Sequence, residues 1–203
     1  MKRLALFLIT ILCFGCGDDD GTNPTPPVPG NAACFEAGAD CEIQPLAVGN
    51  TWTYEYRLYN LDDSLISVDT SDMQIVRDTV IGSETWYLDP PAKYINRDDG
   101  LWAGEINYGE AKGIYLYPGQ PGDTFYCNVC SYPKDLLSIS DTVTIGLGTY
   151  LCYKYRAQSP TLEWGYTYVA PGVGRVLYEM YFNGDETTGY LQYKETLIGL
   201  TLE

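Results

Sequence analysis

The sequence contains no histidine among its 203 residues. Catalytic triads and dyads that rely on an imidazole base are therefore excluded, and so are zinc active sites with histidine ligands. Basic side chains are scarce as well, because 12 lysines and arginines stand against 27 aspartates and glutamates, for a net charge of −15. A chain without a basic patch cannot neutralise phosphates, so we expect no nucleic acid partner.

Long apolar runs are also lacking, except at the N-terminus. Residues 4–14 form an unbroken run of apolar or neutral side chains after the basic Lys2 and Arg3. The run is too short for a helix that crosses a bilayer core of roughly 30 Å. It has the length and flanks of the hydrophobic region of a signal peptide.

The run ends in Gly15-Cys16, after which the sequence becomes acidic. These first 20 residues resemble a bacterial lipoprotein signal, in which a peptidase cuts just before a cysteine that carries a thioether-linked diacylglycerol. Cys13 departs from that pattern, because the family usually has leucine there. The resemblance implies that residues 1–15 are a cleaved signal peptide and that Cys16 is the lipid attachment site and the membrane anchor. A secretory signal without lipid is the alternative.

The acidic run Asp18-Asp19-Asp20 follows that cysteine. It resembles the export tags of surface lipoproteins in the Bacteroidetes, which implies the bacterial outer membrane, with the cell surface favoured over the periplasmic face. The alternative is the solvated start of a linker. Residues 17–30 are rich in proline and glycine and cannot bury enough apolar surface to offset their ordering entropy. We therefore predict a lipidated cysteine with a disordered tether over residues 16–33, and one domain over residues 34–203.

Alternating side chains predict the fold of that domain. Between Thr51 and Leu58, aromatic and aliphatic residues occupy every second position, which is typical of a half-buried strand. Similar short segments recur between Gly, Pro, Asn and Asp turns. Leu65–Val68 and Met73–Ile81 are interpreted as two strands, with one long bulged strand as the alternative. Tyr132–Leu137 is the only helical candidate. We predict an all-β domain of about 10–12 antiparallel strands, as a curved sheet, half-barrel or barrel, with a two-sheet sandwich as the alternative.

The second half of the domain carries a further resemblance. The segments 148–154 and 168–176 look like strand motifs of uncharacterised bacterial envelope lipoproteins. Those proteins have a curved antiparallel sheet similar to the half-barrels of lipoprotein carriers. The resemblance implies a fold and an envelope setting, and it implies no activity.

Four cysteines of the domain suggest disulfides. We predict the local pairs Cys34–Cys41 and Cys127–Cys130, although four cysteines allow three pairings. A redox centre at the CxxC spacing and a zinc site of four thiolates are alternatives, but an oxidising envelope favours disulfides. Cys152, inside a predicted strand, is expected to be a buried free thiol.

Tyrosine and tryptophan are abundant, with 19 and 4 copies. Three strands each carry a strip of apolar side chains on one of their faces. The strips are Trp52, Tyr54 and Tyr56; Trp164, Tyr166 and Tyr168; and Val176, Tyr178, Met180 and Phe182. The plainer interpretation is the core of a β domain. The alternative is that one strip lines a groove for an apolar or sugar ligand, and the first two strips are our candidate ligand-facing aromatics.

These observations favour a lipid-anchored, non-enzymatic envelope protein whose β domain binds an apolar, glycan or protein ligand, without a cofactor or metal. A surface glycan-binding accessory protein is the alternative. A hydrolase that uses paired carboxylates is a further alternative, but most of the candidate carboxylates lie in predicted turns. Those candidates are Asp62-Asp63, Asp89, Asp98-Asp99 and Asp185-Glu186.

Overall fold

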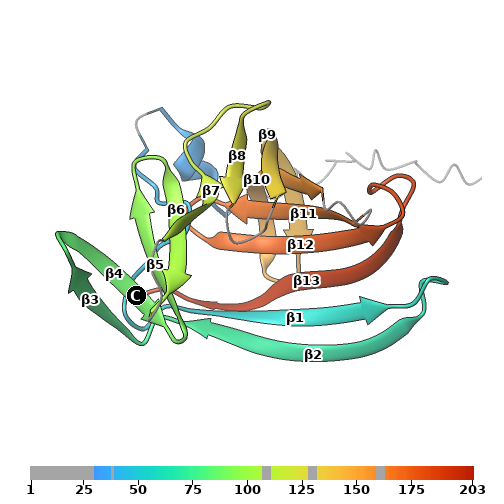
Figure 1. Ribbon diagram of the computed structural model, residues 1–203, viewed down its shortest axis with the longest axis horizontal. Coiled ribbons are helices and arrows are strands. Elements are labelled where there is room, and N and C mark those ends of the chain that lie inside the picture. Colours follow the sequence, from blue (N-terminus) through green and yellow to red (C-terminus); the bar gives the residue numbers. More distant parts are fainter. Residues whose placement is uncertain (1–29, 38, 107–110, 128–131, 159–162) are drawn as a thin grey trace, which may run out of the picture.

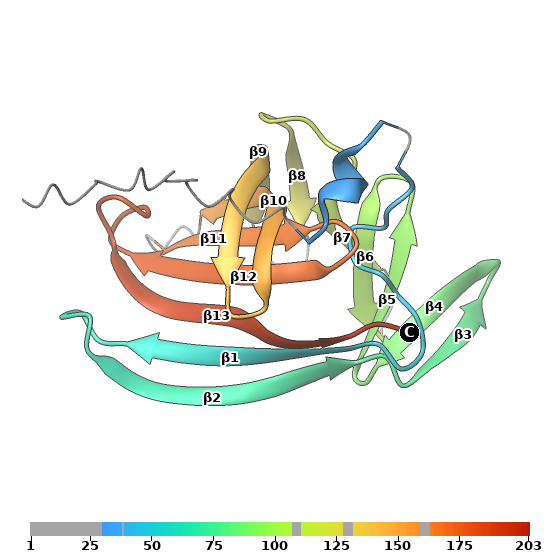
Figure 2. The same ribbon diagram turned by 180° about the vertical axis from the view of Figure 1, so that it is seen from behind.

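The computed structural model describes residues 30–37, 39–106, 111–127, 132–158 and 163–203. These residues form thirteen strands and one short 3₁₀ helix (Figures 1 and 2), which confirms the predicted all-β class. The elements are η1 (Ala32–Phe35), β1 (Thr51–Tyr59), β2 (Leu65–Gln74), β3 (Arg77–Ile81), β4 (Glu84–Asp89), β5 (Ala92–Arg97), β6 (Gly100–Glu105), β7 (Lys112–Leu116), β8 (Thr124–Cys127), β9 (Tyr132–Ile145), β10 (Gly148–Gln158), β11 (Glu163–Ala170), β12 (Gly174–Phe182) and β13 (Tyr190–Thr201).

The strands form two antiparallel sheets. The large sheet has eight strands in the order β2-β1-β13-β12-β11-β10-β9-β8, and the small sheet has five in the order β3-β4-β5-β6-β7. The large sheet curves strongly (Figure 1), but β2 and β8 remain its two edges, so a closed barrel is wrong and an open curved sheet is what forms. The small sheet lies against one end of the large sheet and covers part of one face, which we call the inner face.

The domain core lies between the two sheets. Trp52, Tyr54 and Tyr155 of the large sheet pack in one buried cluster with Leu101 and Tyr115 of the small sheet. Alternation explains this arrangement, because every second side chain of a strand points to the same face. The Trp52 indole N–H also donates a hydrogen bond of 2.6 Å to the carbonyl of Val173, so this buried polar group is satisfied.

The outer face of the large sheet is partly covered by the sheet itself. The β9–β10 hairpin bends back across β11, β12 and β13 (Figure 2), and β9 contacts both β12 and β13. Val143, Tyr150 and Cys152 of this hairpin are buried in the core cluster. The middle strands of the large sheet are therefore packed on both faces.

Two predicted elements differ from the structure. Tyr132–Leu137 lies in β9 rather than in a helix, because β9 is hydrogen-bonded to β10 along its length and to β8 at its start. The stretch Met73–Ile81 is divided between two sheets. The chain leaves the large sheet at Ile75, whose backbone exchanges hydrogen bonds with Asn50 and Gly49 and whose side chain is fully buried, and it then enters the small sheet.

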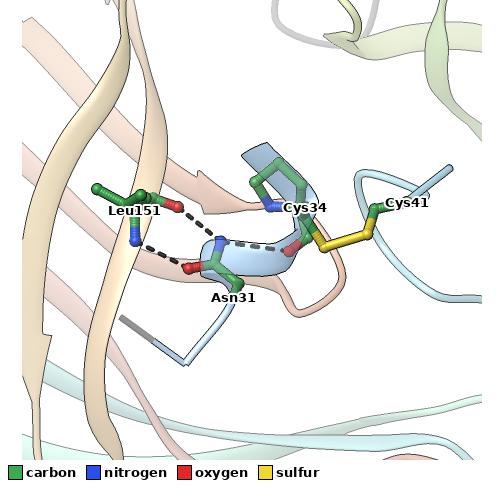
Figure 3. Close-up of a disulfide and its surroundings, with 5 residues drawn as sticks. Asn31, Cys34, Cys41 and Leu151 are labelled. Carbon is green, nitrogen blue, oxygen red and sulfur yellow. Dashed lines mark hydrogen bonds between the residues drawn. A yellow bond between two sulfur atoms is a disulfide. The ribbon is translucent and has the colours of Figure 1, made fainter. Parts of the chain in front are cut away.

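An N-terminal segment closes part of the edge of β10. β10 pairs with β11 only from Tyr153 onward, which leaves residues 149–151 without a strand on that side. The backbone N–H of Gly30 donates to the carbonyl of Thr149, and the side chain of Asn31 bonds to Leu151 (Figure 3). Gly30 and Asn31 fall within the predicted tether, yet they are fixed to the domain.

The edge strand β2 is left open. All residues of β2 are exposed except Met73, and β2 pairs with β1 on one side only. Leu65, Ile66 and Val68 on this strand are each about half exposed. No helix among the residues that the structure describes is long and apolar enough to span a membrane.

Candidate functional site

Burial falls steadily along the inner face. On β1, Trp52 is 0% exposed and Tyr54 is 2% exposed, whereas Tyr56 is half-buried and Leu58 is 37% exposed. The strands β12 and β13 show the same trend away from the small sheet. The reason is visible in Figure 1, where β1, β12 and β13 extend well beyond the small sheet. The inner face therefore has a covered half and an uncovered half.

Three tyrosines meet on the uncovered half. The ring centroid of Tyr193 lies 6.0 Å from that of Tyr56 and 5.8 Å from that of Tyr178, with tilted planes. Met180 stands directly opposite Tyr193 in the β12–β13 register, and Leu58 stands opposite it on the other side. We call these five residues the open inner face. They present aromatic and aliphatic surface together with phenolic hydroxyls.

An ion pair with a buried carboxylate marks the border between the two halves. Arg175 pairs with Glu195, and its guanidinium lies 4.8 Å from the ring centroid of Tyr54. Glu195 is 5% exposed, so burial raises the pKa of this carboxyl while Arg175 acts to lower it. The hydroxyl of Tyr193 donates to Glu195 at 3.3 Å. The ion pair therefore holds the central tyrosine of the open inner face in position.

The second predicted strip lies on the opposite face of the sheet. Tyr166 and Tyr168 are 3% and 8% exposed, and the amine of Lys154 lies 5.0 and 5.3 Å from their ring centroids. Lys154 is held there by Glu186 at 2.8 Å. Trp164 is half-buried beneath the guanidinium of Arg156. These side chains pack against the protein's own cations rather than lining an open surface.

The six candidate aromatics are therefore not brought together. Trp52, Tyr54, Tyr166 and Tyr168 are buried, and only Tyr56 belongs to the open inner face. The sequence did single out Tyr178 and Met180 as part of a third strip. It missed Tyr193 and the Arg175–Glu195 pair, because nothing in the pattern separates Arg175 and Glu195 from Glu179 and Lys194, the other charged residues of the same two strands.

The structure describes only some of the cysteines that the sequence analysis named. Cys34 and Cys41 form a disulfide with a Cα–Cα distance of 5.5 Å (Figure 3). The side chain of Cys127 and all of Cys130 lie outside the described residues, so their predicted pairing remains a prediction. Cys152 is a fully buried free thiol, and burial, together with Asp141, raises its pKa to about 12.

Two of the turn carboxylates serve local structure. Asp62 accepts hydrogen bonds from the backbone and hydroxyl of Ser64, and Asp185 accepts them from Thr187 and Thr188. These are the bonds that keep Asp at turns. Within the described part of the chain, no group of three or more acidic or cysteine side chains is placed to hold a metal ion.

Comparisons with known proteins give a likeness of fold alone. No family model matches the sequence, and no curated protein matches it significantly. Two crystal structures are similar over 80% of this chain and 100% of theirs. One is a protein of Bacteroides fragilis that is inferred to be exported and has a YmcC-like fold, with 14% identity and a TM-score of 0.47. The other is an inferred lipoprotein of Parabacteroides distasonis, with 16% identity and a TM-score of 0.45. At these values the likeness says nothing about what this chain binds.

Proposed function

We propose that this protein is a lipid-anchored, non-enzymatic protein of the bacterial outer membrane that binds a ligand on its open inner face. The anchor is the acylated Cys16, and the acidic run after it favours the cell surface over the periplasmic face. The binding surface is formed by Tyr56, Tyr178 and Tyr193 with two aliphatic neighbours. The observation that supports binding is the fall in burial along the inner face, from 0% exposure at Trp52 to 37% at Leu58.

The side chains of this surface favour a ligand with apolar groups and hydrogen-bond acceptors. Apolar surface that a fold leaves uncovered beside its core is a common place for a partner to bind. Tyrosine suits such a surface, because its ring contributes contact area and its hydroxyl contributes a polar contact. The ion pair beneath Tyr193 keeps one ring oriented before a ligand arrives.

The anchor is tested by membrane fractionation. Cys16→Ala removes the only sulfur that the proposal acylates, so the variant should appear in the soluble fraction, whereas Cys152→Ala should stay with the membrane. Mass spectrometry of the N-terminal peptide of the native protein should show a diacylglycerol-modified Cys16. A membrane-bound Cys16→Ala variant would reject this residue as the anchor.

The binding surface is tested with an amphiphilic fluorescent probe that has apolar rings, 1-anilinonaphthalene-8-sulfonate. The native chain should bind it saturably at neutral pH, and Tyr193→Ala should weaken binding at least about tenfold, which corresponds to about 1.4 kcal/mol. Tyr190→Ala is the matched control, because Tyr190 lies on the same strand and is 48% exposed. Equal losses in both variants, or no saturable binding, would show that the open inner face is not the site.

A further inference from the structure

A row of side chains crosses the inner face from β9 to β13 and ends on the open inner face. In the register of the large sheet, Lys134 stands opposite Ala157, which stands opposite Gly165. Gly165 stands opposite Met180, which stands opposite Tyr193. Opposite residues of neighbouring strands point to the same face, so Lys134 shares the face of Tyr193. Neighbouring strands lie about 4.8 Å apart, which places Lys134 about 14 Å from Met180 along the sheet.

Lys134 is a buried cation without an acidic partner. It is 8% exposed, and its amine donates one hydrogen bond, of 3.3 Å, to the backbone carbonyl of Ile114 on β7. The amine also lies 4.9 Å from the ring centroid of Tyr115. Among the residues that the structure describes, no carboxylate forms an ion pair with this amine. An ammonium group has three N–H donors, so Lys134 keeps capacity for further acceptors.

The other charges on the inner face do not compensate Lys134. Glu195 is already paired with Arg175, so these two side chains are neutral together. Glu163 and Asp69 occupy the same face by register, but neither lies within ion-pair distance of a described cation. Burying a charge costs free energy unless an opposite charge approaches it. An anionic group on a ligand would supply that charge.

A tyrosine hydroxyl reaches into the same row. A Cβ atom added at Gly165 would lie 2.9 Å from the hydroxyl oxygen of Tyr178, so the hydroxyl lies directly over this glycine. Tyr178 belongs to β12 and Gly165 to β11, which means that the ring points across the sheet toward β9. The hydroxyl makes no hydrogen bond with any described residue. Like the amine of Lys134, it is a donor, and anionic groups are the strongest acceptors for such donors.

Small residues separate the lysine from the open inner face. Gly165 has no side chain, and Ala157 carries only a methyl group and is half-buried. Beyond them the row becomes apolar, with Met180, Tyr193 and then Leu58 on β1. The row is therefore cationic at one end and apolar at the other, which is the pattern that an amphiphile matches.

We infer that the open inner face binds an amphiphile with a single anionic head group, which Lys134 and Tyr178 hold while the apolar body packs on Met180, Tyr193 and Leu58. The inference rests on the proposed function, because it names the ligand class of the same surface. The protein as a whole repels anions, since its net charge is −15. A contribution of the anionic group to affinity must therefore come from a local cation.

Two dyes that share their rings test the head group. 1-Anilinonaphthalene-8-sulfonate is an anion, and N-phenyl-1-naphthylamine lacks the sulfonate and is neutral. The otherwise complete chain with Cys16→Ala is used, because it carries no lipid and needs no detergent that would take up the dyes. In this chain, Lys134→Met should weaken binding of the sulfonate dye at least about tenfold, the loss expected for a hydrogen bond to a charged group. It should leave binding of the neutral dye within about twofold.

Two further variants define the contact. Tyr178→Phe removes only the hydroxyl, so it should weaken the sulfonate dye about threefold and leave the neutral dye unchanged. It also keeps the test decisive if Lys134→Met fails to fold. Lys194→Met is the matched control, because Lys194 is paired with Glu179 and stands beside Tyr193 on the opposite face of β13. It should change the binding of neither dye.

A pair of chain molecules that differ only in their head groups extends the test to carboxylates. Decanoate and decanamide should both displace the neutral dye, since their chains occupy the open inner face. In Lys134→Met, the ratio of their displacing concentrations should shift in favour of decanamide by at least about tenfold. Lys194→Met should keep the ratio of the native residue.

The outcomes separate the inference from the proposed function. If neither dye bound saturably, the open inner face would not be a binding site and both proposals would fall. If both dyes bound and depended on Tyr193, but Lys134→Met and Tyr178→Phe affected them equally, only the inference would be overturned. Displacement by decylamine at a lower concentration than by decanoate would also overturn it, because the face would then select a cation.

Discussion

Asn31 bonds to both backbone groups of Leu151, a residue 120 positions later in the chain. Its side-chain amide donates to the carbonyl of Leu151 at 2.8 Å and accepts from its N–H at 2.9 Å. Asn31 is 4% exposed, so these bonds are shielded from water. One side chain thereby replaces the strand that β10 lacks on this edge.

The first prediction concerns this contact. Asn31→Ala should lower the free energy of unfolding by about 1–3 kcal/mol, because the N–H and C=O of Leu151 lose their partners in a buried place. Hydrogen exchange should show faster exchange at the Leu151 amide. Asn60→Ala, at an exposed asparagine, is the control and should change neither quantity. Unchanged protection of Leu151 would mean that the contact is not stable in solution.

The second prediction concerns the disulfide. Replacing both Cys34 and Cys41 with serine should destabilise the domain by about 2 kcal/mol, since the bond closes a short loop and restricts the unfolded chain. The melting temperature of the double variant should fall, and dithiothreitol should lower that of the native protein to a similar value. If the double variant melted like the native protein, the bond would carry no stability.

The third prediction concerns Lys134, which is 8% exposed with its amine 4.9 Å from the ring centroid of Tyr115. Burial, followed by the positive charge of Arg175, lowers the pKa of Lys134 to about 8, against an ordinary value of 10.5. Between these values the unfolded chain binds more protons, so stability should rise with pH, by about 2 kcal/mol from roughly pH 7.5 to 9.5.

Urea denaturation across that pH range measures the rise. Lys134→Met should be more stable than the native protein at neutral pH, because it no longer buries a charge, and its stability should not depend on pH in this window. Lys194→Met, at a more exposed lysine that pairs with Glu179, is the control and should keep the rise. If the stability of Lys134→Met still rose with pH, another titrating group would be its cause.

The fourth prediction concerns Cys152. Because burial raises its pKa to about 12, almost no thiolate exists at pH 8, and no path to the sulfur is open. Iodoacetamide should leave Cys152 unmodified in the folded protein and should alkylate it in urea, as read by peptide mass mapping. Rapid alkylation of the native protein would show that the β9–β10 hairpin opens.

The fold class could be predicted because it depends on local pattern. The alternation of β1 correctly placed Trp52, Tyr54 and Tyr56 on one face of their strand. Tyr132–Leu137 was misjudged because six residues of mixed polar and apolar character do not reveal which strands they pair with. Its strand conformation comes from pairing with β8 and β10.

The candidate sites could be predicted only in part, because they depend on which surfaces meet. Alternation shows that Tyr166 and Tyr168 share a face, but it cannot show that this face lies opposite that of Tyr56 and packs against Lys154 of β10. Lys134 and Tyr193 come from strands far apart in the sequence. No local pattern connects them, and only the register across β10, β11 and β12 does so.

Because the edge of β2 is open, the protein depends on its negative charge to stay in solution. Each molecule offers a ten-residue ribbon of peptide groups that a second copy could match in antiparallel fashion. The strong negative charge, −15 for the full sequence, keeps copies apart at neutral pH. That repulsion vanishes near the isoelectric point of 4.2 and is screened beyond about 10 Å at 0.1 M salt. We therefore expect the β2 edges of two copies to pair, and the protein to precipitate, at a pH near 4 or at high salt concentration.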